Sequence, residues 1–173
     1  MIRAIVCVDK NWGIGKDNHL LFDIPEDMEF FKSTTTGQIV CMGYNTLLSL
    51  PGAKPLKDRI NIVICPADVQ VGDAITVNTL DELLNKLKEF NHRDVYIIGG
   101  AMLYKSMLPY CGEVLVTRVF ADGEADVFFE DLNQNVNFDL VKNSGIKRSS
   151  AGKMYCFTLY KNLKQKDLDW RAI

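Results

Sequence analysis

The chain has 173 residues, of which 47% are hydrophobic and 24% are charged, a balance that allows one globular domain with a sizeable core. Its formal net charge of -2 provides no basic field, which argues against nucleic acid or an anionic membrane as the main partner. Its five cysteines are scattered and its apolar runs are too short for a signal peptide or a membrane span, so we expect a cytoplasmic protein with reduced thiols and no metal site.

Short apolar, β-branched runs bounded by turn residues predict strands along the whole chain. The clear runs are 2–8, 39–42, 60–65, 95–98, 114–120 and 155–160, with weaker ones at 74–77 and 138–141. Several of these runs are apolar at consecutive positions, which is typical of strands that are covered on both faces.

Helical patterns fall between these strands at 25–35, 80–90 and 101–108. The second is the clearest, because leucines repeat at helical spacing and Thr79 with Glu82 forms a capping box. The alternation predicts an α/β fold with a largely parallel sheet, and the strand-rich last third predicts antiparallel strands at one edge. Residues 162–173 are mostly polar, and we expect them to form a surface extension of a domain spanning 1–161.

The first predicted helix carries an acid that does not lie with the others. A helical wheel places Ile24, Met28 and Phe31 on one apolar stripe, with Glu26 and Glu29 opposite in solvent. Asp27 lies beside the apolar stripe. It is either a first-turn acid that faces the helix dipole or a carboxylate in an apolar pocket. In the pocket it would need a ligand with two N–H donors, such as the edge of a flat heterocycle.

Two glycine turns join strands to helices, at Gly43 and at the pair Gly99 and Gly100. Each is either a structural turn or a place where backbone approaches a phosphate; two together in an open α/β sheet would hold a dinucleotide pyrophosphate. The glycine-interrupted loop 11–15 is either a simple turn or a lid.

These features occur with further motifs in a specific order along the chain. They are IPEDM at 24–28, MGYNT at 42–46, PLKDR at 55–59, IIGGA at 97–101, VLVTRV at 114–119 and DGEADVFF at 122–129. The ordered set, which runs from Ile2 to about Tyr160, resembles the dihydrofolate reductase family of bacterial type. The resemblance implies one domain with a central, mostly parallel eight-stranded sheet, an antiparallel C-terminal edge strand and about four flanking helices.

The resemblance also implies an activity: hydride transfer from NADPH to 7,8-dihydrofolate, giving tetrahydrofolate for one-carbon metabolism, in a monomer that is a target of antifolates. Asp27 would bind the 2-amino group and adjacent ring nitrogen of the pterin, and Arg59 the glutamate tail. The implied catalytic residues are Asp27, Phe22 and Tyr104. The implied substrate-binding residues are Ile5, Val6, Asp27, Met28, Phe31, Leu50, Leu56, Arg59, Ile98 and Thr117. The implied cofactor-binding residues are Cys7, Ile14, Gly15, Gly43, Tyr44, Asn45, Thr46, Cys65, Ile98, Gly99, Gly100, Ala101, Met102, Leu103 and Tyr104. The bond between the two glycines would be cis.

The chain departs from the family's pattern at two places. Leu21-Phe22 stands where Pro-Trp is usual, so the indole N–H is missing next to Asp27. Basic or hydroxyl groups usual around the adenosine 2'-phosphate are also missing, since the corresponding positions are Tyr44, Cys65, Pro66, Asn78 and Met102. We therefore expect a weakened preference for NADPH, with NADH as a possible cofactor.

Two other functions compete with this one. A related reductase of other pterin-like or pyrimidine substrates could share the fold, although Arg59 implies a substrate with a glutamate tail. The second is a non-catalytic or divergent pterin- or nucleotide-binding domain, against which Asp27 and the two glycine turns argue.

Overall fold

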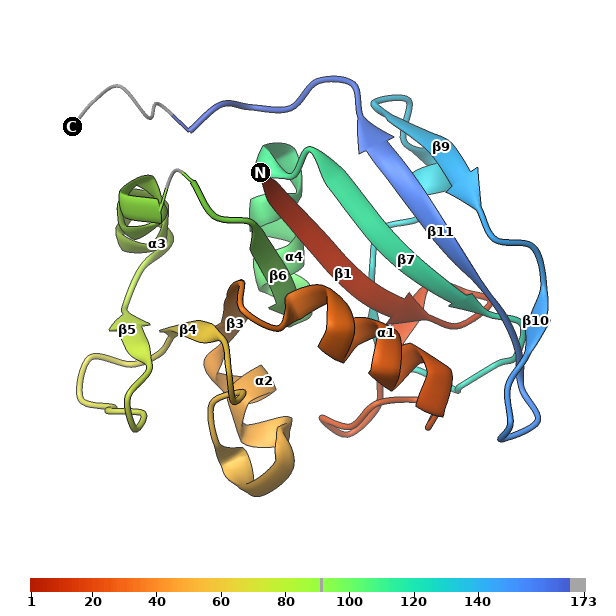
Figure 1. The fold of residues 1–173 in the computed structure, drawn as a ribbon, viewed down its shortest axis with the longest axis horizontal. Coiled ribbons are helices and arrows are strands. Elements are labelled where there is room, and N and C mark those ends of the chain that lie inside the picture. The colour runs from red at the N-terminus through yellow and green to blue at the C-terminus, as the bar shows by residue number, and fades with distance from the viewer. Residues whose placement is uncertain (91, 169–173) are drawn as a thin grey trace.

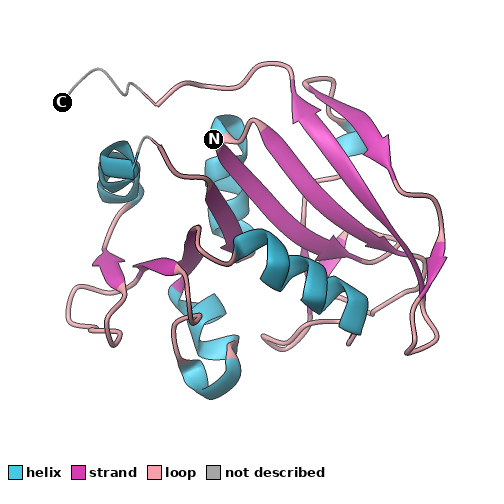
Figure 2. Ribbon diagram, viewed as in Figure 1, coloured by secondary structure: helices cyan, strands magenta, loops and turns pink. Residues whose placement is uncertain are grey.

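The computed structural model describes residues 1–90 and 92–168, built around one large twisted sheet (Figures 1 and 2). Eight of its strands follow the order β10-β11-β7-β1-β6-β3-β4-β5, and β9 pairs with β11 off this path. The strands are β1 (Ile2–Val8), β3 (Ile39–Gly43), β4 (Ile60–Ile64), β5 (Ile75–Val77), β6 (Val95–Gly99), β7 (Glu113–Val119), β9 (Phe138–Asn143), β10 (Lys147–Arg148) and β11 (Met154–Asn162).

The pairing confirms the predicted sheet. All neighbours from β7 to β5 along the path are parallel, whereas β11 is antiparallel to β7, β9 and β10. The central strands are buried at consecutive positions, as their unbroken apolar runs indicated, because helices cover both of their faces.

Four helices flank the sheet, as predicted. They are α1 (Pro25–Thr35), α2 (Tyr44–Ser49), α3 (Leu80–Leu87) and α4 (Ala101–Met107), with short 3-10 turns η1 (Pro51–Ala53), η2 (Lys88–Phe90), η3 (Leu108–Tyr110) and η4 (Leu132–Gln134). The capping box is confirmed, since the Thr79 hydroxyl accepts a hydrogen bond from the backbone N–H of Glu82. Helices α1 and α2 pack in one apolar cluster and α3 and α4 in another, on opposite faces of the sheet.

A separate two-stranded ladder was not predicted from the sequence. Strand β2 (Gly13–Gly15) pairs antiparallel with β8 (Val127–Phe128). Both strands are too short, and β2 too rich in glycine, to produce a recognisable pattern of alternation. The ladder ties the loop after β1 to a segment more than 100 residues further along the chain.

The expected C-terminal extension begins by packing on the domain. Asn162 ends β11, and its side-chain amide donates to the backbone carbonyl of Cys111 at 2.9 Å. The Lys166 backbone N–H donates to the carbonyl of Pro109 at 2.8 Å, and Leu168 is only 6% exposed in the main core. Residues up to 168 thus follow the surface of the packed domain, with Leu163 53% exposed; Trp170 and Ile173 lie outside the described residues.

Candidate active site

The Asp27 carboxylate lies inward, next to the sheet. Its Oδ1 accepts a hydrogen bond of 2.6 Å from the hydroxyl of Thr117, which is buried on β7. Cys7 is the partner of Thr117 in the β1–β7 ladder, so the two side chains lie next to each other on the same face. Burial raises the pKa of the Asp27 carboxyl, and hydrogen bonds from Thr117 and Cys7 oppose that rise. The wheel argument for Asp27 is confirmed in that the carboxylate is on the inward flank.

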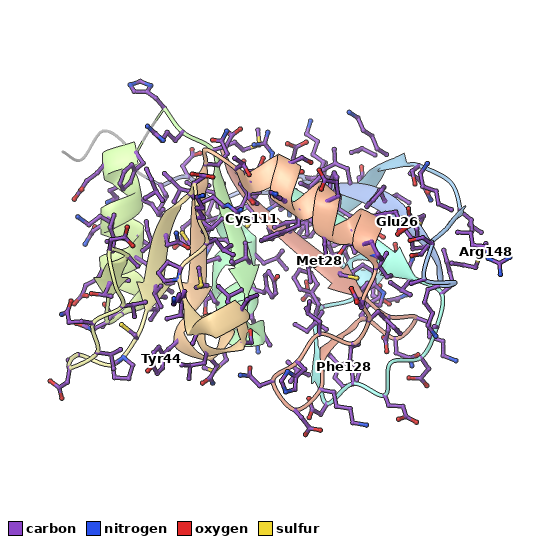
Figure 3. The ribbon with its side chains drawn as sticks, turned by 60° about the horizontal axis from the view of Figure 1, so that its bottom comes forward. Glu26, Met28, Tyr44, Cys111, Phe128 and Arg148 are labelled. Carbon is purple, nitrogen blue, oxygen red and sulfur yellow. The ribbon has the colours of Figure 1, made fainter. Side chains whose placement is uncertain are left out.

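The wheel was wrong about Met28, which it placed on the inward stripe. Met28 is 48% exposed. Ile24 before it is 2% exposed and Asp27 beside it faces the sheet, so the buried side of the first turn is narrower than the wheel predicted and excludes Met28, which Figure 3 shows at the side of α1. Apolar candidates for the substrate passage instead meet in one cluster below α1. That cluster contains Ile5, Phe31, Leu50, Leu56 and Ile98.

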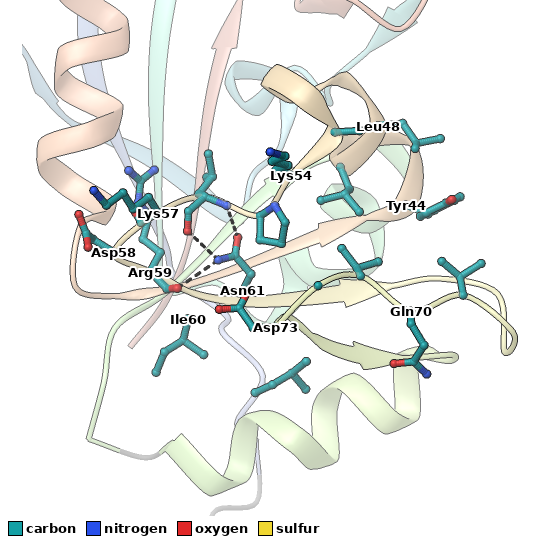
Figure 4. A pocket seen from close by; sticks show the side chains of 18 of the residues that line it. Tyr44, Leu48, Lys54, Lys57, Asp58, Arg59, Ile60, Asn61, Gln70 and Asp73 are labelled. Carbon is teal, nitrogen blue, oxygen red and sulfur yellow. Dashed lines mark hydrogen bonds between the residues drawn. The ribbon is translucent and has the colours of Figure 1, made fainter.

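Arg59 follows a loop whose shape is set by Asn61. The Asn61 amide accepts from the backbone N–H of Leu56 at 2.9 Å and donates to the carbonyls of Leu56 at 2.8 Å and Arg59 at 3.1 Å (Figure 4). The Nε of Arg59 donates to the carbonyl of Lys57 at 2.9 Å. Partial burial lowers the pKa of the guanidinium, and the nearby Asp58 opposes that shift. The loop therefore holds a guanidinium with unused N–H donors next to α1.

Most of the predicted cofactor residues line one hollow of about 360 Å³ where β1 and β6 end. The peptide bond between Gly99 and Gly100 in its wall is cis, as the resemblance implied. Tyr104 extends from α4 and donates its hydroxyl to the Ile5 carbonyl at 2.8 Å, and burial raises the pKa of that hydroxyl. Predicted residues in this wall are Val6, Cys7, Ile14, Gly15, Thr46, Ile98, Gly99, Gly100, Ala101 and Tyr104.

The hollow is suited to a ligand that lies against backbone. A Cβ on Gly99 would come within 3.1 Å of the Thr46 hydroxyl, and one on Gly43 within 3.8 Å of the Gly100 nitrogen. The two glycine turns are therefore side by side, which is the arrangement that a pyrophosphate needs.

Other predicted cofactor residues lie outside the hollow. Met102 is 85% exposed, and Leu103 packs in the main core, so only the backbone of Leu103 can face this site. Tyr44 lies at the start of α2 and lines a separate groove, together with Leu56 and Arg59. The Cys65 side chain is buried, and its carbonyl accepts a hydrogen bond from the Asn78 amide at 2.9 Å.

The loop after β1 contains site residues that the sequence did not reveal. Asn18, His19 and Leu20 line the hollow, and the Asn18 amide donates to the Asn45 carbonyl on the opposite wall at 3.2 Å. Asp9 is 1% exposed and accepts backbone hydrogen bonds from Asn11, Gly13 and Gly123 at 2.7–3.0 Å. No periodic pattern marks these positions, because their partners come from distant segments.

Glu26 was predicted to be a solvated acid, and this was wrong. Its two oxygens accept hydrogen bonds of 2.7 Å from the Ser149 hydroxyl and the Ser150 backbone N–H. These bonds lower the pKa of Glu26 to about 2. Figure 3 shows Glu26 at the end of α1 nearest the hairpin that carries Arg148. The same hairpin places the Lys153 ammonium 5.7 Å from the centre of the Phe22 ring, so it contacts both Phe22 and the start of α1.

A family model described as dihydrofolate reductase matches residues 1–162. The chain belongs to this family. It is 32% identical over 162 residues to the dihydrofolate reductase of Bacillus subtilis (strain 168), covering 92% of this chain and 94% of that protein. It is 38% identical over 144 residues to the dihydrofolate reductase of Schistosoma mansoni, covering 74% and 77% of the two chains.

The fold agrees with that of a solved family member. Dihydrofolate reductase from Enterococcus faecalis, complexed with NADP(H) and RAB-propyl, superposes with a TM-score of 0.82 at 24% identity, over 94% of this chain and 96% of that one. As a member of the family, this chain is an NADPH-dependent oxidoreductase that reduces dihydrofolate. Within residues 1–90 and 92–168, no helix is long and apolar enough to cross a membrane, and no group of acidic, His and Cys side chains could hold a metal ion.

Proposed function

We propose that the chain reduces 7,8-dihydrofolate to 5,6,7,8-tetrahydrofolate at the site formed by Asp27, Thr117 and the hollow at Gly99 and Gly100, as a cytoplasmic monomer. The observation that carries the assignment of the site is the half-buried Asp27 carboxylate. Its donors within the chain are the Thr117 hydroxyl and the Cys7 thiol, and it lies next to a backbone-lined hollow. A flat heterocycle with two N–H donors matches the free acceptor positions of this carboxylate.

The residues of the chain bind and orient the reactants. Asp27 holds the amidine-like edge of the pterin, and Phe31 with Leu50 and Leu56 packs along the pterin and benzoyl groups. Arg59 binds the α-carboxylate of the glutamate tail through its planar guanidinium. The nicotinamide, when bound, supplies the hydride. Gly43, Thr46, Gly99 and Gly100 would hold its pyrophosphate, with no charged side chain required for close approach.

Protonation of the substrate is assigned to an indirect effect of Asp27. The carboxylate faces the 2-amino end of the pterin, away from the nitrogen that is protonated, so it favours the protonated substrate by its charge. Tyr104 is not the acid, because burial raises the pKa of its hydroxyl further from neutrality. The loop after β1 excludes solvent, supported by the Asn18–Asn45 bond across the hollow.

The experiment is a steady-state assay of nicotinamide absorbance with dihydrofolate and either NADPH or NADH. We expect turnover with NADPH, and a preference over NADH that is weakened because Tyr44, Cys65, Asn78 and Met102 provide no positive charge for a 2'-phosphate. A preference for NADPH of about 1,000-fold, roughly 4 kcal/mol, would contradict the weakened preference. Folate binding without turnover on either cofactor would favour a non-catalytic binding domain.

A further inference from the structure

A second hollow lies behind α4, outside the site described above. Its volume is about 800 Å³, within the range of small-molecule sites. It is enclosed by α4 and η3, by the segment from β8 to the start of β9, and by residues 162–166. It shares only Ala101 and Tyr104 with the hollow at Gly99 and Gly100. Apart from Ala101, Met102 and Tyr104, its lining contains none of the residues expected to bind substrate or cofactor.

The lining of the second hollow combines apolar and aromatic side chains with asparagines, one carboxylate and three lysines. Phe128, Phe138 and Leu108 form part of the walls, and Phe128 is 53% exposed. Three lysines line the opening: Lys105, Lys164 and Lys166. Because the hollow combines aromatic surface with positive charge, it is complementary to a ligand with an apolar body and an anionic group.

Several polar groups of the lining already have partners within the chain. The acid of the lining, Glu130, accepts a hydrogen bond from the Asn135 amide at 2.8 Å. The Asn162 side-chain amide donates a hydrogen bond to the backbone carbonyl of Cys111. Among the residues that the structure describes, no carboxylate forms an ion pair with Lys105, Lys164 or Lys166. The Lys166 ammonium lies 6.0 Å from the centre of the Tyr110 ring, a contact that leaves its positive charge uncompensated, so the three lysines can still pair with an anion.

We propose that this second hollow binds a small aromatic carboxylate or sulfonate, with its rings against Phe128 and Phe138 and its anionic group among the lysines. The ring count follows from the volume, which admits a ligand of two or three rings. Each ammonium is exposed, so its contribution is modest, and the specificity comes from the combination of charge and aromatic surface.

The position of the second hollow couples it to the active site. In β8, Val127 lines the active-site hollow and Phe128 lines the second one, because consecutive strand residues point to opposite sides. The Phe129 ring packs edge-on against that of Tyr104 with centroids 5.0 Å apart, and its backbone N–H donates to the Trp12 carbonyl at 2.8 Å. A ligand against Phe128 thus contacts the strand that pairs with the loop over the active site.

The test is a fluorescence titration with 8-anilinonaphthalene-1-sulfonate on the full chain saturated with folate and NADP⁺, which fill the active site. We expect saturable binding that is weakened about tenfold in the double variant Lys164→Gln and Lys166→Gln, and unchanged in Lys142→Gln and Lys161→Gln, which remove the same charge from exposed positions on β9 and β11. The neutral N-phenyl-1-naphthylamine should bind at least tenfold more weakly. Loss of the signal when folate and NADP⁺ are added, or equal weakening in both double variants, would overturn the proposal.

Turnover provides a second and separate readout, and this part rests on the proposed function. Saturating sulfonate should change kcat at least twofold in the parent chain, and the sulfonate concentration that gives half of this change should be about tenfold higher in the Lys164→Gln, Lys166→Gln variant. An unchanged kcat in the parent chain would refute the coupling through β8. The fluorescence titration requires no turnover, so an inactive protein would contradict the proposed function without affecting the binding result.

Discussion

Replacing Asp27 with Asn removes a charge and one acceptor while keeping the shape of the side chain. The Asn carbonyl can still accept from the Thr117 hydroxyl, which is 2.6 Å from Oδ1 in the parent chain. The amide NH₂ then points at a ligand N–H, where the carboxylate offered an acceptor. Losing a charge-assisted hydrogen bond of about 1.5–3 kcal/mol and gaining a poorly matched donor should cost about 2–4 kcal/mol of folate affinity. This corresponds to weakening of about 30- to 700-fold.

The measurement is calorimetric titration of folate, with kcat/KM for dihydrofolate at pH 7 as a second readout. Glu29→Gln is the matched control, because it removes the same charge two residues away on the exposed side of α1. We expect the control to retain affinity and turnover, and Asp27→Asn to lose turnover sharply near neutral pH. If Asp27→Asn matched the control in both measurements, Asp27 would have no role in substrate binding.

Thermal unfolding of Asp27→Asn distinguishes a loss of folate binding from a destabilised fold. Burial raises the pKa of Asp27 in the folded state, so the ionised carboxylate opposes folding. The protonated carboxyl stabilises the folded state at pH values below its pKa in the unfolded chain. This stabilisation is lost as the pH rises through its pKa in the folded protein. Asp27→Asn should therefore have a Tm at pH 7 at least equal to that of the parent, and this advantage should disappear as the pH is lowered.

Three further predictions concern Arg59, Tyr44 and Glu26. Arg59→Ala should weaken folate binding by about 2–4 kcal/mol in a titration, with Lys57→Ala as control; an equal loss for a pterin without a glutamate tail would contradict the assignment. Tyr44→Arg should raise the preference for NADPH over NADH about tenfold in kcat/KM, since it restores a cation for the 2'-phosphate; an unchanged ratio would place that phosphate elsewhere. Glu26→Gln should lower Tm above pH 4.5 and approach the Tm of the parent as the pH falls to 2 and below, because a carboxylate with a pKa of about 2 stabilises the fold above its unfolded pKa and loses this effect as the pH falls through its folded pKa; a difference in Tm that is constant with pH would refute the stabilising role of the hydrogen bonds from Ser149 and Ser150.

The sequence predicted the features that depend on neighbours along the chain. Helix α1 and the inward position of Asp27 follow from a local period, and the largely parallel character of the sheet follows from apolar runs that alternate with helices. The ordered motifs indicated the family, and the family resemblance implied the cis peptide bond between Gly99 and Gly100 that the structure shows.

The tertiary structure decided what depends on distant segments. A wheel assumes that one whole side of a helix is covered, but in the first turn of α1 Asp27 faces the sheet while Met28 is 48% exposed. Glu26 and Asp9 are anchors because Ser149 and Gly123 fold back onto them from more than 100 residues away. The lysines around the second hollow come from α4 and from the segment after β11, which only folding brings together. Local periodicity determines which face of an element is apolar; what lies against that face, or leaves it open, is set by the packing of the whole chain.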